Sequence, residues 1–308
     1  MEKITGLIGR DQLIDETRKE IKKGKNVLLS GPIGIGKSSI LQAALESFIN
    51  AGKQTVIRLT DHQAKGQFVE MARQMLESRL VTAKALGLTQ KYHDIPPAEL
   101  EWDEIKRQVN RLSIRDLTAA IIPALADAGK KPLIAVDDMT FLTPTQQAFW
   151  LAIFDHAQIV GCASEKKKGL RKLWWKMKEI EVPPLSAEAT KQVVQSYIIK
   201  KGVMIESPDL YISHVVKQSG GIPQAIYDML DESAKERVID KRKVRAMRHE
   251  AGVKYLDFTP VMLVAGAMIV ATRYVAMGMG DKTLYVMAGI GAALFLSLRF
   301  FMFKGIGR

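Results

Sequence analysis

The sequence has very few of the residues that build disulfide frameworks or metal centres. Its one cysteine, Cys162, lies inside an apolar run, so no disulfide framework is available and we expect a reducing compartment. The five histidines show no metal-ligand spacing, and each is interpreted as an ordinary surface or core histidine. The composition therefore argues against a disulfide-rich secreted domain and against a histidine metal centre.

Signal sequences, repeats and low-complexity tracts are also missing. The first twelve residues, MEKITGLIGRDQ, hold no apolar core of signal-peptide length. Acidic residues are outnumbered, with 33 Asp and Glu against 45 Lys and Arg, which gives a formal net charge of +12. Such a chain prefers anionic surfaces, either nucleic acid or the cytoplasmic face of a membrane, and composition does not choose between them. Its 308 residues suffice for two modest domains.

One short glycine-rich stretch, GPIGIGKSS, carries the strongest chemical signal. It fits the pattern G-x-x-x-x-G-K-[ST], follows an apolar run and opens a helix-like stretch, which is the context that a phosphate-binding loop needs. Backbone N–H groups and the helix dipole would hold the phosphates of ATP, Lys37 would reach the β- and γ-phosphates, and Ser38 would be a Mg²⁺ ligand. The alternative is a glycine-rich turn that binds nothing. The predicted loop residues are Gly31, Pro32, Gly34, Ile35, Gly36, Lys37, Ser38 and Ser39.

Apolar strands alternate with helical patterns over the first 184 residues. This alternation predicts an α/β fold with a parallel five-stranded sheet flanked by helices. The predicted strands are 26–30, 54–59, 133–136, 158–163 and 179–182. Helical patterns cover 13–23, 39–47, 63–128 with a break at 91–97, 146–156, and a basic stretch at 166–178.

A second region begins after Pro183-Pro184, where Ser186 is placed to cap a new helix. The predicted domains are a P-loop ATPase core at 1–184, a small all-α lid at 185–234, a basic juxtamembrane helix at 235–257 and a two-helix membrane hairpin at 258–303.

The hairpin prediction depends on two uncharged segments. Residues 258–272 and 283–298 contain no charge, and each reaches the roughly 20 residues of a span only if Arg273 or Arg299 lies near a segment end. The alternative is a buried helical hairpin or an oligomer-packing pair. Basic residues before the first segment and at Lys304 and Arg308 predict a two-span protein with both termini and the ATPase domain cytoplasmic.

Two acidic residues and one serine follow predicted strands. Asp137 closes an apolar strand as a Walker B aspartate should and would hold Mg²⁺ through water, while Asp138 would orient the attacking water. A helix cap or a loop is the alternative for this acidic pair. Ser164, at the end of the next strand, would hydrogen-bond the γ-phosphate or the water, although small polar residues are common at strand ends.

Taken in order, these motifs resemble those of AAA+ ATPases of the Orc type and of the STAND NTPases. Leu7-Ile8-Gly9-Arg10 resembles the hhGR entry motif, which implies that Gly9 and Arg10 lie over the adenine. Ser164 matches the sensor 1 position, and Gly221-Ile222-Pro223 matches a GxP motif in which Pro223 lies at the nucleotide. The resemblance spans roughly residues 5 to 230, and the membrane segment after the lid is similar to the architecture of ATPases of the ExeA type.

Two departures from this resemblance bear on the rate of hydrolysis. AAA+ enzymes usually carry Glu at the position of Asp138, and Gln224 stands where the sensor 2 arginine of GxPR is expected. Both predict slow hydrolysis and a nucleotide-controlled switch. Arg171, in the basic stretch after the fourth strand, is the best placed candidate for an arginine finger acting in a neighbouring subunit, and a solvated basic helix is the alternative.

The sequence thus predicts a membrane-anchored ATPase that acts as a slow switch or remodeller of a partner complex. Expected partners are further copies of the chain, anionic membrane lipid and a protein that the sequence does not identify. Nucleic acid is a less favoured partner of the basic segments. The alternatives are a membrane-tethered, nonspecific DNA-binding ATPase regulator and a scaffold with a structural ATP site.

Overall fold

The computed structural model describes residues 7–52, 54–96, 99–235, 238–241, 244 and 259–306. The chain divides into two compact units, Met1–Gly252 and Val253–Arg308. Each is described by itself.

The first unit contains a five-stranded sheet in the order β2-β3-β4-β1-β5. Every neighbouring pair in this sheet is parallel, as the alternation of strands and helices predicted. Because β4 lies between β1 and β3, the end of β4 lies between the ends of the strands that carry the phosphate loop and the acidic pair. The strands are β1 Val27–Ser30, β2 Val56–Leu59, β3 Leu133–Val136, β4 Gln158–Ala163 and β5 Lys178–Glu181.

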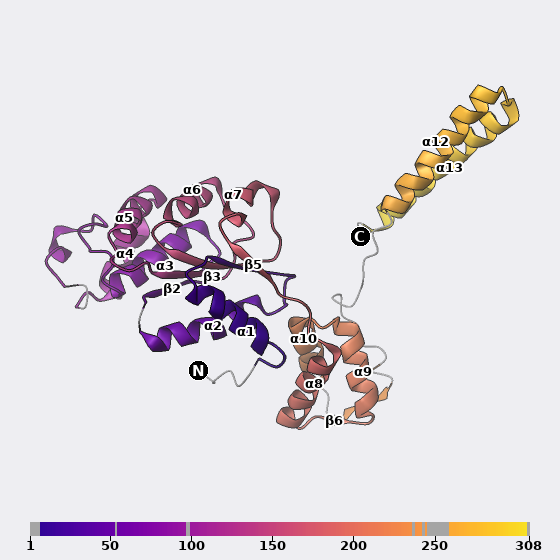
Figure 1. Cartoon of the computed structure of the whole chain (residues 1–308). Coiled ribbons are helices and arrows are strands. Elements are labelled where there is room, and N and C mark those ends of the chain that lie inside the picture. Colours follow the sequence, from indigo (N-terminus) through magenta and orange to yellow (C-terminus); the bar gives the residue numbers. More distant parts are fainter. Residues whose placement is uncertain are drawn as a thin grey trace. The chain divides into compact units, whose positions relative to one another are not determined.

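Helices cover both faces of the sheet, and the strands alternate their side chains between two apolar cores (Figure 1). Val27 and Leu29 pack toward α1 and α2, whereas Leu28 packs toward the other helices. The helices of this part are α1 Asp11–Lys22, α2 Lys37–Ala51, α3 Ala64–Glu77, α4 Trp102–Arg111, α5 Ile114–Ala126, α6 Pro144–Ile153 and α7 Arg171–Trp174, with 3₁₀ turns η1 Gln90–Tyr92 and η2 Lys168–Leu170.

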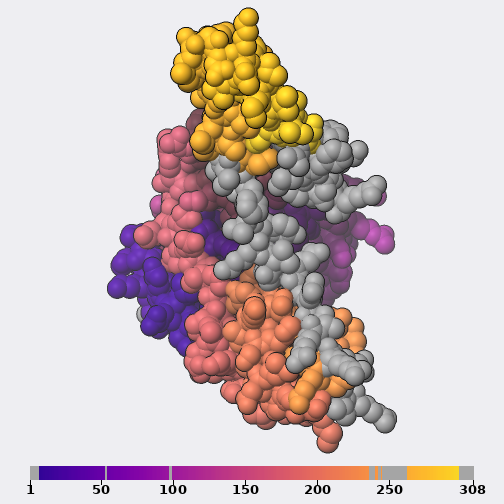
Figure 2. All heavy atoms as spheres, turned by 90° about the vertical axis from the view of Figure 1, so that its right-hand side faces the viewer, coloured from indigo at the N-terminus to yellow at the C-terminus, as the bar shows by residue number. Residues whose placement is uncertain are grey.

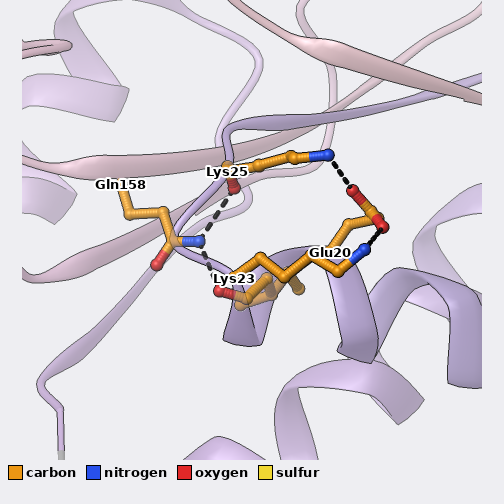
Figure 3. A network of polar contacts seen from close by, with 5 residues as sticks. Glu20, Lys23, Lys25 and Gln158 are labelled. Carbon is orange, nitrogen blue, oxygen red and sulfur yellow. Dashed lines mark hydrogen bonds and ion pairs between the residues drawn. The ribbon is translucent and has the colours of Figure 1, made fainter.

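A polar network joins the end of α1 to the start of β4 at the amino end of the sheet (Figure 3). Gln158 Nε2 donates to the backbone oxygens of Ile21 and Lys25, each at 2.8 Å. Glu20 accepts from Lys23 at 2.6 Å and from Lys25 at 2.7 Å. These hydrogen bonds, first from Lys23 and then from Lys25, lower the pKa of Glu20 from 4.5 to about 2. The network fixes the turn that delivers β1 to its position in the sheet.

Two of the predicted helical stretches are interrupted. The pattern over 63–128 was expected to break only at 91–97, but α3 ends at Glu77, and Arg79 then adopts a left-handed backbone with φ of 59°. The connection to α4 packs Val81, Leu86 and Leu88 into the core, so its apolar residues serve a loop. The expected helix over 166–178 is also wrong, because only η2 and the short α7 form and Lys178 already pairs with Val27 in β5.

A small helical lid completes the first unit. It consists of α8 Ala187–Lys201, α9 Pro208–Ser219 and α10 Pro223–Ser233, which pack around buried residues such as Val194, Tyr211 and Leu230. Ser186 caps α8 as predicted, because its Oγ accepts from the backbone N–H of Ala189 at 3.1 Å.

A two-stranded parallel pair, β6 Met204–Ile205 with β7 Val238–Ile239, adds to the lid and was not predicted. Val244 is buried in the same apolar cluster. Most of the basic helix predicted at 235–257 lies outside the described residues, and the predicted limits between domains stay predictions.

The second unit is a helical pair, α12 Thr259–Met279 and α13 Lys282–Ile306, in which the two helices pack against each other. Its apolar side chains lie mostly on the outside, and the unit is drawn in yellow in Figure 2. Residues Met262–Met279 are long and apolar enough to cross a membrane, while 282–297 form a shorter apolar stretch. Within the described residues, one helix therefore meets the length and composition of a span.

Candidate nucleotide site

The loop from Gly31 to Gly36 connects β1 to α2 with the backbone geometry that its glycines allow. Gly34 and Gly36 have φ of 78° and 94°, a left-handed region that favours glycine. Gly36 stands before the first residue of α2 without a side-chain cap, so the first N–H groups of this helix are available to a ligand. The arrangement leaves a helix N-terminus that could bind an anion, and nucleotide binding by the loop stays a prediction.

Lys37 folds back over this loop. Its Nζ donates to the backbone oxygen of Gly31 at 2.7 Å, to that of Pro32 at 2.9 Å and to Ser164 Oγ at 3.2 Å. Burial lowers the pKa of Lys37, and the nearby Asp138 carboxylate acts in the opposite direction. The ammonium group thus lies between the carboxyl ends of β1 and β4, where the phosphates of a nucleotide are predicted to bind.

The two acidic residues after β3 have different surroundings. Asp137 Oδ2 lies 3.2 Å from Arg58 Nη2, while its Oδ1 is buried without a hydrogen-bond partner. Asp138 Oδ1 accepts from the backbone N–H of Thr140 at 2.8 Å. Asp137 Oδ1 is therefore an unused acceptor that could bind a water or a metal ion. Asp138 Oδ1 is already used by the backbone N–H of Thr140 in the same turn.

Ser164 is tied to the same turn. Its backbone N–H donates to Thr140 Oγ1 at 2.8 Å, and the backbone N–H of Met139 donates to the oxygen of Cys162 at 2.7 Å. Separate hydrogen bonds thus link Lys37 to Ser164 Oγ, the Ser164 N–H to Thr140 Oγ1, and the Thr140 N–H to Asp138. Sequence analysis predicted three of these four residues and missed Thr140, which is buried.

Arg10 is buried and bonded entirely to backbone. Its Nη1 donates to the oxygen of Pro183 at 2.7 Å and its Nη2 to that of Ile35 at 3.1 Å. Burial lowers the pKa of Arg10. These bonds link the phosphate loop to the segment that enters the lid. Gly9 is required beside it, since a Cβ there would lie 2.8 Å from the Cβ of Ala189.

The lid contacts the phosphate loop directly. The backbone N–H of Gln224 donates to the oxygen of Gly34 at 3.1 Å, and a Cβ on Gly34 would lie only 2.7 Å from that of Gln224. The Gln224 side chain donates to Asp228 Oδ1 at 2.8 Å, within its own helix. The amide that replaces the expected sensor 2 arginine is therefore engaged in α10.

A cavity of about 820 Å³ opens between the entry segment, the phosphate loop and the lid. Its volume is in the range of small-molecule and cofactor sites. The predicted residues on its wall are Arg10, Gly34, Ile35, Gly36, Lys37, Ser38, Ser39 and Pro223. Gly31 and Pro32 contribute their carbonyl oxygens to Lys37 instead.

The lid wall of this cavity was not predicted from the sequence. It is formed by one face of α8, with Tyr227 from α10 added. The α8 residues recur at spacings of one, three and four, the helical periodicity that could have revealed a shared face. They are Val193, Ser196, Tyr197, Lys200 and Lys201.

Arg171 lies apart from this cavity. It is exposed, with its guanidinium 4.7 Å from the ring centre of Trp175, and it is not among the residues that line the cavity. A role in a neighbouring subunit stays a prediction.

The residues present fit a magnesium ion bound together with a nucleotide. Among the described residues, no group of three or more His, Cys, Asp or Glu side chains could hold a metal ion. Mg²⁺ in nucleotide sites is usually held by one or two protein oxygens, by phosphates and by water. Ser38 in the first turn of α2 and the unpartnered Oδ1 of Asp137 supply that kind of donor set.

Comparison with known proteins gives no family assignment. No family model matches the chain, and no curated protein matches it. Among solved structures, the Walker-type ATPase PABY2304 of Pyrococcus abyssi is 16% identical, with 91% of this chain and 78% of that chain covered and a TM-score of 0.48. A RuvB variant of Thermotoga maritima is 13% identical, with 89% and 81% covered and a TM-score of 0.43.

Proposed function

We propose that this chain is a membrane-anchored ATPase of the AAA+/STAND kind, which binds Mg·ATP and hydrolyses it slowly to switch or remodel a partner complex. The main support for an ATP site is the position of Lys37 Nζ, which donates to two carbonyl oxygens of the loop and to Ser164 Oγ. Lys37 is the first residue of α2, whose N-terminus has no side-chain cap. Among the described residues, no other lysine ammonium donates hydrogen bonds at the carboxyl ends of two sheet strands, here β1 and β4. The geometry matches what a triphosphate needs at its β- and γ-phosphates.

Each of the predicted site residues has its own proposed role. Backbone N–H groups at the start of α2 bind phosphate, and Lys37 exchanges its carbonyl partners for phosphate oxygens. Ser38 and Asp137 would hold Mg²⁺, which when bound neutralises charge on the β- and γ-phosphates. Ser164 donates toward the γ-phosphate, and Asp138 accepts from the attacking water. Pro223 and α8 of the lid line the cavity and would contact the base of the nucleotide.

Slow turnover follows from two side chains. Asp138 is shorter than glutamate, and its Oδ1 already accepts from Thr140 N–H at 2.8 Å. Gln224 carries no charge and is bonded to Asp228. Transition-state charge at the γ-phosphate then relies on Lys37 and on any cation that a neighbouring subunit supplies. The proposal is a protein that holds ATP for a long time and changes its assembly with nucleotide state.

The membrane part of the proposal is supported by α12 and α13. In the span candidate Met262–Met279 only 6% of the residues are buried, which is unlike the core helix of a soluble protein. The one charge in that stretch, Arg273, donates to the hydroxyl of Tyr285 at 2.8 Å and lies 4.7 Å from its ring centre. A charged side chain in an apolar helix is expected to have such a partner. We propose that both helices enter the bilayer and that both termini stay on the cytoplasmic side.

Three experiments test the parts of the proposal separately. Binding of a fluorescent ATP analogue to the full chain, compared with Lys37→Ala, tests the nucleotide site. Protease treatment of inside-out vesicles tests the topology, because the ATPase core should be digested from outside. Protection of the core in such vesicles would contradict the proposed orientation.

An ATPase assay of the full chain tests the partners. Anionic lipid, further copies of the chain and duplex DNA are added to it one at a time, and stimulation by DNA alone would favour the DNA-binding regulator.

A further inference from the structure

Arg58 brings a positive charge from the edge strand β2 to the proposed metal site. It pairs in register with Ala135, two residues before Asp137, so Arg58 and Asp137 project from the same face of the sheet. Arg58 Nη2 and Asp137 Oδ2 are 3.2 Å apart. The side chains are 35% and 17% exposed, so solvent screens their attraction only in part.

The backbone of Arg58 is held in place by α3. The N–H of Arg58 donates to Gln74 Oε1 at 2.8 Å, and Gln74 Nε2 donates to the oxygen of Arg58. The side-chain amide of Gln74 thus takes the place of a further strand at the free edge of the sheet. The backbone position of Arg58 is therefore fixed, which keeps its guanidinium close enough to contact Asp137.

The ion pair is incomplete on both sides. Asp137 Oδ1 and Arg58 Nε are both buried and have no hydrogen-bond partner. Buried polar atoms without partners are uncommon and costly, and each calls for an explanation. A pair that only stabilised the fold would be expected to use these atoms, for example in a two-point contact between the guanidinium and the carboxylate. The single contact leaves one carboxylate oxygen available at the proposed metal site.

We propose that Arg58 is a positioning residue that holds Asp137 while the site is without metal and releases the carboxylate when Mg·ATP binds. Arg58 then sets the Mg²⁺ concentration that nucleotide binding requires, because its positive charge beside Asp137 Oδ2 opposes the binding of a second cation at the same carboxylate. This inference rests on the proposed ATP site and adds a regulatory step to it. The described part of the chain offers no other basic side chain within ion-pair distance of Asp137.

The test is a Mg²⁺ titration of fluorescent ATP-analogue binding to the full chain in detergent or vesicles. Arg58→Met removes the charge and keeps the length of the side chain. It should lower the Mg²⁺ concentration for half-maximal binding about fivefold, the size expected for losing competition from one partly screened ion pair. Arg58→Lys keeps the charge and should stay within about twofold of the unsubstituted protein.

Arg73→Ala is the matched control. Arg73 forms a similar ion pair with Glu77, with Nε and Oε1 2.8 Å apart, on the solvent side of α3. Its removal changes the net charge by the same amount without touching Asp137, so its Mg²⁺ titration should be unchanged. An equal shift in Arg73→Ala and Arg58→Met would assign the effect to net charge and overturn the inference.

Failure of the inference and failure of the proposed function look different. If the unsubstituted chain binds the analogue and Arg58→Met needs the same or more Mg²⁺, Arg58 has no such role and the ATP site stands. If the unsubstituted chain binds no analogue at any Mg²⁺ concentration, the proposed function fails and the inference with it. Binding in EDTA, measured for each variant, shows whether the nucleotide site itself is intact.

Discussion

Lys37 Nζ lies 3.2 Å from Ser164 Oγ and thereby joins the first turn of α2 to the end of β4. The two residues are 127 positions apart in sequence, and the strand order places them together. From Ser164 the hydrogen bonds continue to Thr140 and Asp138. These contacts tie Lys37 to the acidic turn after β3.

The first prediction concerns Thr140. Replacing it with valine keeps its shape but leaves the partly buried N–H of Ser164 without its acceptor at 2.8 Å. We expect a loss of about 1 to 3 kcal/mol in the free energy of unfolding. ATP turnover should fall as well, because Ser164 is no longer held in place.

Chemical denaturation of the full chain in detergent measures the stability change. Thr118→Val is the control, because the Thr118 hydroxyl donates within its own helix at an exposed position. Equal stability of Thr140→Val and the unsubstituted chain would show that the hydrogen bond from Ser164 N–H to Thr140 Oγ1 does not contribute to the free energy of unfolding.

The second prediction uses two glycines with nearly the same backbone. Gly34 has φ of 78° and Gly24 has φ of 75°, so alanine costs similar backbone strain at either position. At Gly34 the new Cβ would also lie 2.7 Å from Gln224 Cβ, whereas at Gly24 nothing lies within 4 Å. Gly34→Ala should therefore weaken nucleotide binding by about tenfold or more, and Gly24→Ala should not.

The same pair shows whether the effect is local to the phosphate loop. The difference between the two variants reports what a Cβ does at Gly34, in the loop and against α10, and not a general effect of alanine at a left-handed glycine. Identical nucleotide affinities in the two variants would exclude the contact between Gly34 and α10 as a determinant of binding.

The third prediction concerns pH and Glu20. Its pKa is lowered from 4.5 to about 2 by hydrogen bonds from Lys23 and Lys25, so the folded state favours the ionised form. The resulting stability is fully present above about pH 4.5 and is lost as the pH falls toward 2. Glu20→Gln should be less stable than the unsubstituted chain at pH 6.

The difference between these two proteins should shrink as the pH falls through this window. Urea unfolding at several pH values between 2 and 6 measures it. A stability difference that stayed constant over the window would show that Glu20 ionisation does not stabilise the fold.

The fourth prediction concerns the helical pair. Val270 and Leu294 are 51% and 60% exposed, so aspartate at either position costs little in water. Inside a bilayer each aspartate would cost about 2.5 to 3.5 kcal/mol at the centre of a span. The double variant Val270→Asp, Leu294→Asp should therefore move from the vesicle fraction toward the soluble fraction in flotation.

Ile199→Asp is the control for this prediction. Ile199 is an apolar residue in α8 of the first unit and is 82% exposed. Its substitution should leave flotation unchanged. Unchanged flotation of the double variant would show that α12 and α13 are not what binds the membrane.

Features that depend on neighbouring residues were predictable from sequence, because they are fixed by short-range patterns. The glycine spacing from Gly31 to Gly36 needs no distant residue to bend the loop. Ser186 was likewise predicted as a helix cap from its position before α8. The five-stranded parallel sheet followed from the alternation of apolar strands and helices.

Features that depend on the order of the strands were not predictable. Arg58 and Asp137 meet because β2 pairs with β3, and no local pattern around Arg58 predicts an acidic partner 79 residues away. The basic stretch after β4 reads as one helix by pattern, but pairing of β5 with β1 draws Lys178 into the sheet. Arg171, expected on a long helix, stands on the four-residue α7. Tertiary pairing overrides helical propensity at that point.

The phosphate-loop assignment is tested most directly by the affinity of the full chain for ATP with and without Lys37. Lys37→Ala removes the ammonium held by Gly31, Pro32 and Ser164, while Lys19→Ala removes an exposed lysine of α1 as a control. We expect a loss of affinity of about tenfold to hundredfold for Lys37→Ala, the cost of one charge-assisted contact to phosphate, and no change for Lys19→Ala. Equal ATP affinity of Lys37→Ala and the unsubstituted chain would contradict the assignment of the phosphate loop.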